Sequence, residues 1–233
     1  MWTAQTTLPV GDPPPPLAGL RPNFVDYALG WGLRDFHGRK LVGHTGGVPG
    51  FVSRVLLVPE ENLGVVVLTN AEEGGAFSSI VYHLLDYYFH LPPPDWVSAF
   101  KAVKDKEEAD AVETVKKAAG ARDLNSKPSL PLEKYVGVYN DAWYGPITIR
   151  MEKGGLTILI THPTMVGDLQ HWQYDTFKTH WRTRTIEDAF VTFSLSPDGS
   201  IDSARMAAVS PLADFSFDYQ DLLLKPVVPA EKK

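Results

Sequence analysis

Residues 43–51 read Gly-His-Thr-Gly-Gly-Val-Pro-Gly-Phe, and this stretch lies between two runs of sequence that are typical of β-strands. Five of its nine residues are glycine or proline. Glycine within a strand pattern often marks a bulge, or a place where another backbone or a ligand comes close. The histidine and the threonine supply polar groups beside that opening. We therefore expect the edge of a functional site here.

The flanking sequence predicts two β-hairpins and then a helix. The first hairpin runs from Phe24 to His44 with a turn at residues 36–40, and the second joins residues 51–58 to residues 63–70. The last of these strands is apolar on both faces, which favours a central strand covered on both sides. Residues 76–90 carry an apolar stripe at helical spacing and are expected to pack on the sheet. The proline-rich residues 1–23 are interpreted as a loop.

The rest of the chain is predicted to form a connector and a second domain. Asp95 stands at the N-cap of a highly charged helical pattern that reaches about residue 119, and polar sequence continues to residue 130. From residue 131 on, about eight short β-like segments alternate with turn signals, the last at residues 215–219. The predicted fold class is α+β, with a partial antiparallel sheet and its C-terminal helix in residues 1–94, a helical connector in residues 95–130, and a small antiparallel β-barrel in residues 131–233.

The composition argues against several classes of protein. With 44% hydrophobic and 21% charged residues the chain is globular, and no apolar run approaches the roughly 18 residues of a transmembrane helix. A net charge of -6 and the lack of a basic patch argue against a nucleic-acid partner. Because the chain has no cysteine, disulfides and thiol chemistry are excluded.

The motifs resemble those of the serine β-lactamase and penicillin-binding protein superfamily, and most of all its class C β-lactamase-like branch. The resemblance rests on residues 27–32 (Tyr-Ala-Leu-Gly-Trp-Gly), on residues 44–46 (His-Thr-Gly) in the place of the family's Lys-Thr-Gly motif, and on the strand at residues 63–70. Residues 132–139 resemble the opening of the lipocalin-like domain that often follows such hydrolases. The resemblance therefore implies a β-lactamase-like part in residues 1–94 and a lipocalin-like barrel behind it.

The resemblance also implies a chemistry, which is acyl transfer from an amide or ester substrate to a serine nucleophile. In this scheme His44 assists proton movement or contacts the substrate, and the Gly47 N–H is one of two oxyanion donors. No cofactor is implied, and the family's members commonly act in the periplasm or outside the cell. The residues expected to bind the substrate are Thr45, Gly46, Tyr27 and Trp31.

The nucleophile is not where the family places it. Ser-x-x-Lys and Tyr-x-Asn precede the third motif in the family, but no serine precedes His44 and no Tyr-x-Asn occurs in this sequence. Ser98 and Lys101 match Ser-x-x-Lys after the motif, and so short a pattern arises easily by chance. We therefore expect Met1 to be a truncation point and the chain to be the C-terminal part of a longer hydrolase, inactive alone. The missing segment could also come from a separate chain.

Purely structural explanations stay open for the same residues. His44 could be an ordinary strand-end histidine, and an aromatic such as Tyr27 or Trp31 on a hairpin is usually part of a core. The barrel could enclose a small ligand or hold a partner, which would make the protein a binding module, or side chains could fill it. An incomplete sheet would expose its edges, so a homo-oligomer is expected as well.

Three histidines recur every nine residues in the predicted barrel. His162, His171 and His180, with Asp168 between them, could bind zinc. Their spacing does not fit the usual close pairs of ligands, and they are expected to fall on different strands. No metal site is therefore predicted.

Overall fold

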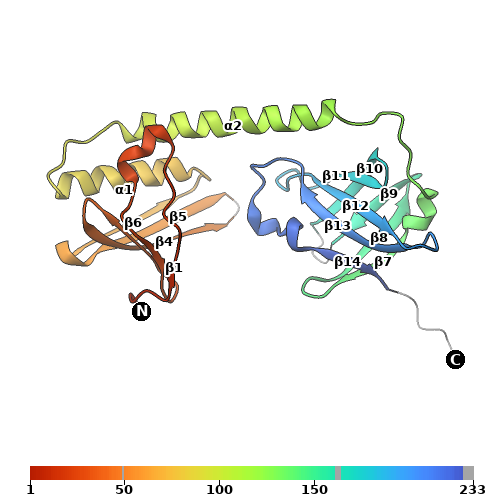
Figure 1. The fold of residues 1–233 in the computed structure, drawn as a ribbon, viewed down its shortest axis with the longest axis horizontal. Helices are drawn as coiled ribbons and strands as arrows, with labels where there is room; N and C mark the ends of the chain where they lie inside the picture. The colour runs from red at the N-terminus through yellow and green to blue at the C-terminus, as the bar shows by residue number, and fades with distance from the viewer. Residues whose placement is uncertain (49, 161–163, 228–233) are drawn as a thin grey trace. The chain divides into compact units, whose positions relative to one another are not determined.

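The structure, a computed structural model, describes residues 1–48, 50–160 and 164–227. Pro49 and His162 of the sequence-based hypotheses therefore lie outside the described residues. The chain folds into two compact units, residues 1–107 and residues 108–233 (Figure 1). The fold class is α+β as predicted, with an antiparallel sheet and helices followed by a closed antiparallel barrel. None of the helices in the described residues combines the length and the apolar character that a membrane span requires.

The first unit is built on a six-stranded antiparallel sheet whose strands follow one another in chain order. Its turns are tight because the sequence supplies residues with positive φ. The turn between the third and fourth strands consists of His37 and Gly38, with φ values of 50° and 77°, as a type I′ hairpin turn requires. The strands are β1 (Thr6–Thr7), β2 (Val25–Tyr27), β3 (Gly32–Phe36), β4 (Arg39–Val48), β5 (Phe51–Val58) and β6 (Leu63–Thr69).

Helix α1 (Gly74–Tyr88) covers one face of this sheet (Figure 1). The helix begins where the Glu73 side chain accepts a hydrogen bond from the Gly75 N–H at 3.2 Å. Most of the apolar stripe predicted for residues 76–90 faces the sheet, but Ile80 and Tyr88, which were expected in it, are 47% and 50% exposed. The core between them contains Phe36, Leu41, Leu56, Val58, Val65, Val81, Tyr82, Leu85 and Phe89.

Two expectations for the first unit are wrong. Residues 63–70 do not form a central strand, because β6 is the last strand of the sheet, and Val66 and Leu68 on its uncovered face are 65% and 77% exposed. An apolar run alone does not tell a buried strand from an edge strand with one bare face. Residues 1–23 are also not simply a loop, since they contain β1 and a 3-10 helix (Pro15–Leu20) that buries Leu17 and Leu20 in the core.

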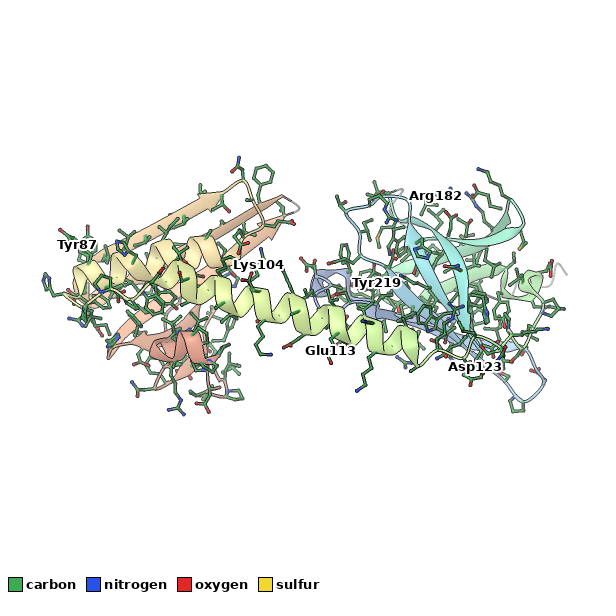
Figure 2. All side chains as sticks on the ribbon, turned by 90° about the horizontal axis from the view of Figure 1, so that it is seen from above. Tyr87, Lys104, Glu113, Asp123, Arg182 and Tyr219 are labelled. Carbon is green, nitrogen blue, oxygen red and sulfur yellow. The ribbon has the colours of Figure 1, made fainter. Side chains whose placement is uncertain are left out.

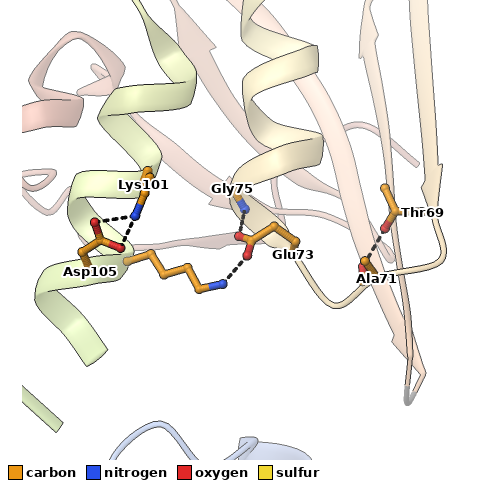
Figure 3. Close-up of polar contacts among 7 residues, drawn as sticks. Thr69, Ala71, Glu73, Gly75, Lys101 and Asp105 are labelled. Atoms are coloured by element: carbon orange, nitrogen blue, oxygen red, sulfur yellow. Dashed lines mark hydrogen bonds and ion pairs between the residues drawn. The ribbon is translucent and has the colours of Figure 1, made fainter. Parts of the chain in front are cut away.

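Helix α2 (Trp96–Gly120) follows, and its charged pattern was correctly predicted (Figure 2). Asp95 caps it, because its carboxylate accepts the Ser98 N–H at 3.0 Å. The first turn packs on the first unit, where the buried Trp96 donates its indole N–H to Asp86 at 2.6 Å. Burial raises the pKa of the Asp86 carboxyl. Lys104 pairs with Glu73 at the start of α1 (Figure 3), and its hydrogen bond lowers the pKa of the Glu73 carboxyl.

The second unit is a closed barrel of eight antiparallel strands, as predicted. One strand was placed wrongly: residues 215–219 form 3-10 turns (Phe215–Phe217 and Tyr219–Asp221), and the strand that closes the barrel is β14, four residues later. The strands are β7 (Gly137–Asp141), β8 (Gly145–Glu152), β9 (Gly155–Leu159), β10 (Val166–Gln173), β11 (Thr176–Trp181), β12 (Ala189–Leu195), β13 (Ile201–Ala208) and β14 (Leu223–Pro226).

The segment that leads into the barrel is fastened to the turn between β10 and β11. Asp175 in that turn accepts the Ser129 N–H at 2.9 Å, the Ser129 hydroxyl at 2.7 Å and the hydroxyl of the buried Tyr135. Arg122 donates to the Trp172 and His171 carbonyls, and its guanidinium carbon lies 4.7 Å from the centre of the Trp172 ring. These contacts hold residues 122–135 against one end of the barrel.

Candidate functional site

The predicted site falls on a strand whose pairing stops halfway. All of β4 from Val42 to Val48 is paired with β5, but its pairing with β3 runs only from Arg39 to Gly43. Residues 44–48 therefore have β5 on one side and, in the described part of the chain, no strand on the other. All five of these residues are exposed. This unpaired edge of β4 is the candidate site.

The register shows which backbone groups face the unpaired edge. In an antiparallel ladder, a residue that exchanges hydrogen bonds with its partner alternates with one whose N–H and C=O point the other way. The Ser53 hydroxyl lies 3.4 Å from the Gly46 carbonyl oxygen, so that carbonyl is on the β5 side. Thr45 and Gly47, one residue to either side, therefore direct their N–H groups toward the unpaired edge. The His44 ring, which lies 2.5 Å from the Thr45 carbonyl oxygen, agrees with this direction.

The glycines of the motif differ in how much space surrounds them. A Cβ at Gly43 would lie 2.8 Å from the Val55 carbonyl oxygen, and one at Gly46 would lie 2.9 Å from the Ser53 hydroxyl. At Gly47 the nearest atom would be 3.9 Å away, in ordinary contact. Gly43 and Gly46 are thus needed for close approach of β5. At Gly47 the close approach of β5 does not require a glycine.

The structure brings Tyr27 and His44 together. Tyr27 ends β2, and its hydroxyl lies 3.2 Å from His44 Nε2, with the two rings in an edge-to-face arrangement at 6.2 Å. Both residues are exposed at this end of the sheet. Trp31 is partly buried and is used differently, because it packs on the small cluster of Ala28, Leu33 and Val42 and lies edge-on to Trp2.

Arg54 also lies in this region, although the sequence did not predict it as a site residue. It is the direct cross-strand partner of Thr45, so the two side chains share one face of the sheet. Its guanidinium donates to the Ser78 hydroxyl at 3.0 Å and to the Tyr82 hydroxyl at 3.4 Å, and it lies over the Tyr82 ring. Within the described residues no ion pair includes Arg54. A two-residue turn between Val48 and Phe51 could have been inferred from the sequence, and counting back from it pairs Arg54 with Thr45.

Ser98 and Lys101 do not form a nucleophile and its base. The Ser98 hydroxyl donates to Asp95 at 2.7 Å, as part of the N-terminal cap of α2. Lys101 Nζ lies 2.7 Å from both Asp105 carboxylate oxygens, one helical turn further along (Figure 3). Both side chains are therefore engaged in local helix contacts. The match to Ser-x-x-Lys has a structural explanation in the sequence preference of a helix start.

The histidines of the barrel have separate partners. His171 Nε2 lies 2.9 Å from the Tyr174 carbonyl oxygen, and His180 contacts Asp188 at 3.0 Å and Gln170 at 3.1 Å. Over residues 1–48, 50–160 and 164–227, no group of three or more potential ligands gathers to hold a metal ion.

An open groove of about 610 Å³ crosses the outside of the barrel from Glu152 to Arg182. Arg182 (Figure 2) pairs there with Asp168 at 2.7 Å and with Glu152 at 3.2 Å, and its hydrogen bond lowers the pKa of the Asp168 carboxyl. Arg182 therefore pairs with two carboxylates of the groove.

The barrel interior is filled with side chains. Rings of Tyr135, Phe177 and Phe193 meet at 4.9–5.8 Å, and Trp181 stacks on Tyr219 at 6.3 Å (Figure 2). The eighteen residues of this core are at most 7% exposed. Such packing favours the structural reading of the barrel over the reading as a container for a small ligand.

Two family models match separate parts of the chain. Residues 4–87 match the family model described as Beta-lactamase, and residues 121–226 match one described as a domain of unknown function, DUF3471. "Unguisins hydrolase ungD'" of Aspergillus campestris is 28% identical over 156 residues, which are 64% of this chain and 28% of that protein. "Unguisins hydrolase ungD" of Aspergillus violaceofuscus is 28% identical over 158 residues, 64% of this chain and 27% of its own length. The chain thus spans under a third of these curated relatives.

Solved structures include two penicillin-binding proteins among the similar chains. The C-terminal domain of penicillin binding protein Rv0907 is 26% identical, with 46% of this chain and 94% of that chain covered and a TM-score of 0.34. The octameric penicillin-binding protein homologue from Pyrococcus abyssi is 16% identical, with 96% and 40% covered and a TM-score of 0.34.

Proposed function

We propose, from the match of residues 4–87 to the Beta-lactamase family, that β4 is the substrate-binding wall of an acyl-transfer site that hydrolyses amide or ester bonds. The first unit is a β-lactamase-like and penicillin-binding-protein-like hydrolase part, with the barrel behind it. What supports the proposal most is the unpaired edge of β4, where the N–H groups of Thr45 and Gly47 face outward.

In this proposal the main contribution of the chain is the backbone N–H groups of β4, which donate hydrogen bonds to the substrate. An oxyanion site needs fixed N–H donors aimed at the place where negative charge develops. Gly47 supplies one such donor from a rigid strand, with nothing within 3.9 Å of where its side chain would be. Arg54 adds a fixed positive charge on the face that Thr45 shares, and it would attract a substrate with an anionic group.

The nucleophile is proposed to be absent from this chain. Ser98 is the only serine that heads a Ser-x-x-Lys match, and its hydroxyl is committed to the cap of α2. The chain as it stands is therefore expected to bind substrate at β4 without turning it over.

The test has a turnover arm and a binding arm. Purified chain is incubated with nitrocefin and with p-nitrophenyl acetate, and no hydrolysis above the buffer rate is expected; turnover that disappears in Ser98→Ala would overturn the proposed inactivity. For binding, an acetylated tripeptide amide is titrated into 15N-labelled chain. The Thr45 and Gly47 amide signals should shift, and shifts confined to other strands would refute the site.

A further inference from the structure

The contact between Tyr27 and His44 has a direction that the chemistry of the two rings determines. His44 Nδ1 lies 2.5 Å from the Thr45 carbonyl oxygen, and a carbonyl oxygen can only accept a hydrogen bond. Nδ1 must therefore carry a proton. A neutral imidazole has one N–H, so Nε2 then holds a lone pair and accepts from the Tyr27 hydroxyl at 3.2 Å.

Each partner of this contact is held in place by the sheet. The Thr45 carbonyl belongs to the backbone of β4, and Tyr27 ends β2, two strands away. Gly32, the first residue of β3, pairs with Tyr27 on one side and with Gly43 on the other, so His44 lies one residue beyond the start of β3. The Tyr27 hydroxyl can therefore reach the imidazole past the end of β3.

We propose that Tyr27 is a positioning residue for His44, which rests on the proposed acyl-transfer function of β4. The Thr45 carbonyl selects the Nδ1–H tautomer, and the Tyr27 hydroxyl holds the orientation of the ring by donating to Nε2, beside the outward-facing N–H groups of Thr45 and Gly47. If Nε2 takes up a proton, the tyrosine oxygen accepts the new hydrogen bond and the ring does not need to move. In this proposal Tyr27 acts through His44 and not by binding the substrate itself.

The test reads the tautomer directly and needs no turnover. Long-range 1H–15N correlation spectra of chain labelled at histidine report which ring nitrogen carries the proton at a pH where His44 is neutral. A histidine side chain free in water prefers the Nε2–H form. We expect His44 to show the Nδ1–H pattern in the wild type. In Tyr27→Phe the ring loses the hydrogen bond that holds its orientation, so we expect the Nδ1 proton to exchange with water several-fold faster.

Tyr87→Phe serves as the matched control, because Tyr87 is 72% exposed and its ring contacts Tyr88 rather than a histidine. Backbone amide spectra of all three proteins establish that the fold is kept. An Nε2–H pattern for His44 in the wild type, or an Nδ1 proton that exchanges as slowly in Tyr27→Phe as in the wild type, would overturn the proposal. Because the spectra are recorded without substrate, this outcome is independent of the hydrolysis and peptide-binding arms above.

Discussion

Replacing Gly43 by alanine should destabilise the first unit, and the structure gives the reason in two distances. The new Cβ would lie 2.8 Å from the Val55 carbonyl oxygen and 2.8 Å from Leu56 Cδ1. The leucine side chain could turn, but it is only 3% exposed within the core, and the carbonyl belongs to the β5 backbone. We expect the free energy of unfolding to fall by about 1–3 kcal/mol, the usual cost of overpacking a core.

Gly47→Ala is the matched control on the same strand. Its Cβ would meet Val52 Cγ1 at 3.9 Å and the Phe51 carbonyl oxygen at 4.0 Å, which are ordinary contacts. Gly47 is also not among the residues with positive φ, so alanine adopts its backbone conformation without strain. We expect this variant to be more stable than the wild type by about 0.4–1 kcal/mol, because alanine restricts the unfolded chain.

Hydrogen exchange of the full chain is the suitable assay, since a melting curve would mix the unfolding of two units. The slowest amides of β4 and β5 report the opening free energy of the first unit, and each 1 kcal/mol changes their exchange about fivefold. Faster exchange in Gly43→Ala and slower exchange in Gly47→Ala are expected. Equal protection in the two variants would show that space at Gly43 is not the limiting factor, and would refute the reasoning.

Two further predictions concern carboxylates that hold loops. Burial raises the pKa of Asp175, but hydrogen bonds from Tyr135 and Ser129 outweigh it and leave the pKa below its usual value; its stabilisation is present above pH ~4 and is lost as the pH falls through the folded pKa. Asp175→Asn should therefore destabilise the barrel by about 1–2 kcal/mol at neutral pH and by less in acid, as measured by hydrogen exchange of the slowest barrel amides; a difference that does not change with pH would contradict this. Glu72 accepts the Gly50 N–H at 2.7 Å, so Glu72→Ala should speed exchange of the Gly50 amide about fivefold, with a smaller effect in Glu72→Gln, and equal rates in all three proteins would count against the contact.

Much of the fold could be predicted from the sequence because its contacts are local. Strands β3 to β6 are joined in chain order by short turns, so turn residues and alternation were enough to recognise them, whereas β1 lies a long connection before β2 and was missed. The same holds for α1 and for the capped start of α2 at Asp95. Whether a strand lies at the edge or in the centre, in contrast, depends on the whole sheet, and the residues of β6 do not indicate its position. The closing strand β14 was missed for a similar reason, because it closes the barrel by pairing with β7, which lies far away in the sequence.

The candidate site was predicted in place but not in its interactions. The glycines and His44 indicated a site at the β4 edge because their residue types are unusual within a strand. Arg54 gave no such signal, since an arginine in a strand is commonly a surface residue, and only the register with Thr45 gives it a meaning. Tyr27 and His44 lie on β2 and β4, the two strands that flank β3, and local sequence patterns do not indicate a contact between them.

The bare side of β4 also sets a length. At about 3.3 Å per residue, the five residues from 44 to 48 span roughly 16 Å. Backbone groups point outward only at alternate residues, so Thr45 and Gly47 offer two hydrogen-bonding positions about 7 Å apart. An extended molecule with carbonyl groups at that spacing can bind both positions, whereas a compact molecule can bind only one. Because β3 begins at Gly32 and pairs with β4 only as far as Gly43, its starting point sets the length of the free edge. That length in turn determines how long a molecule can pair with the edge.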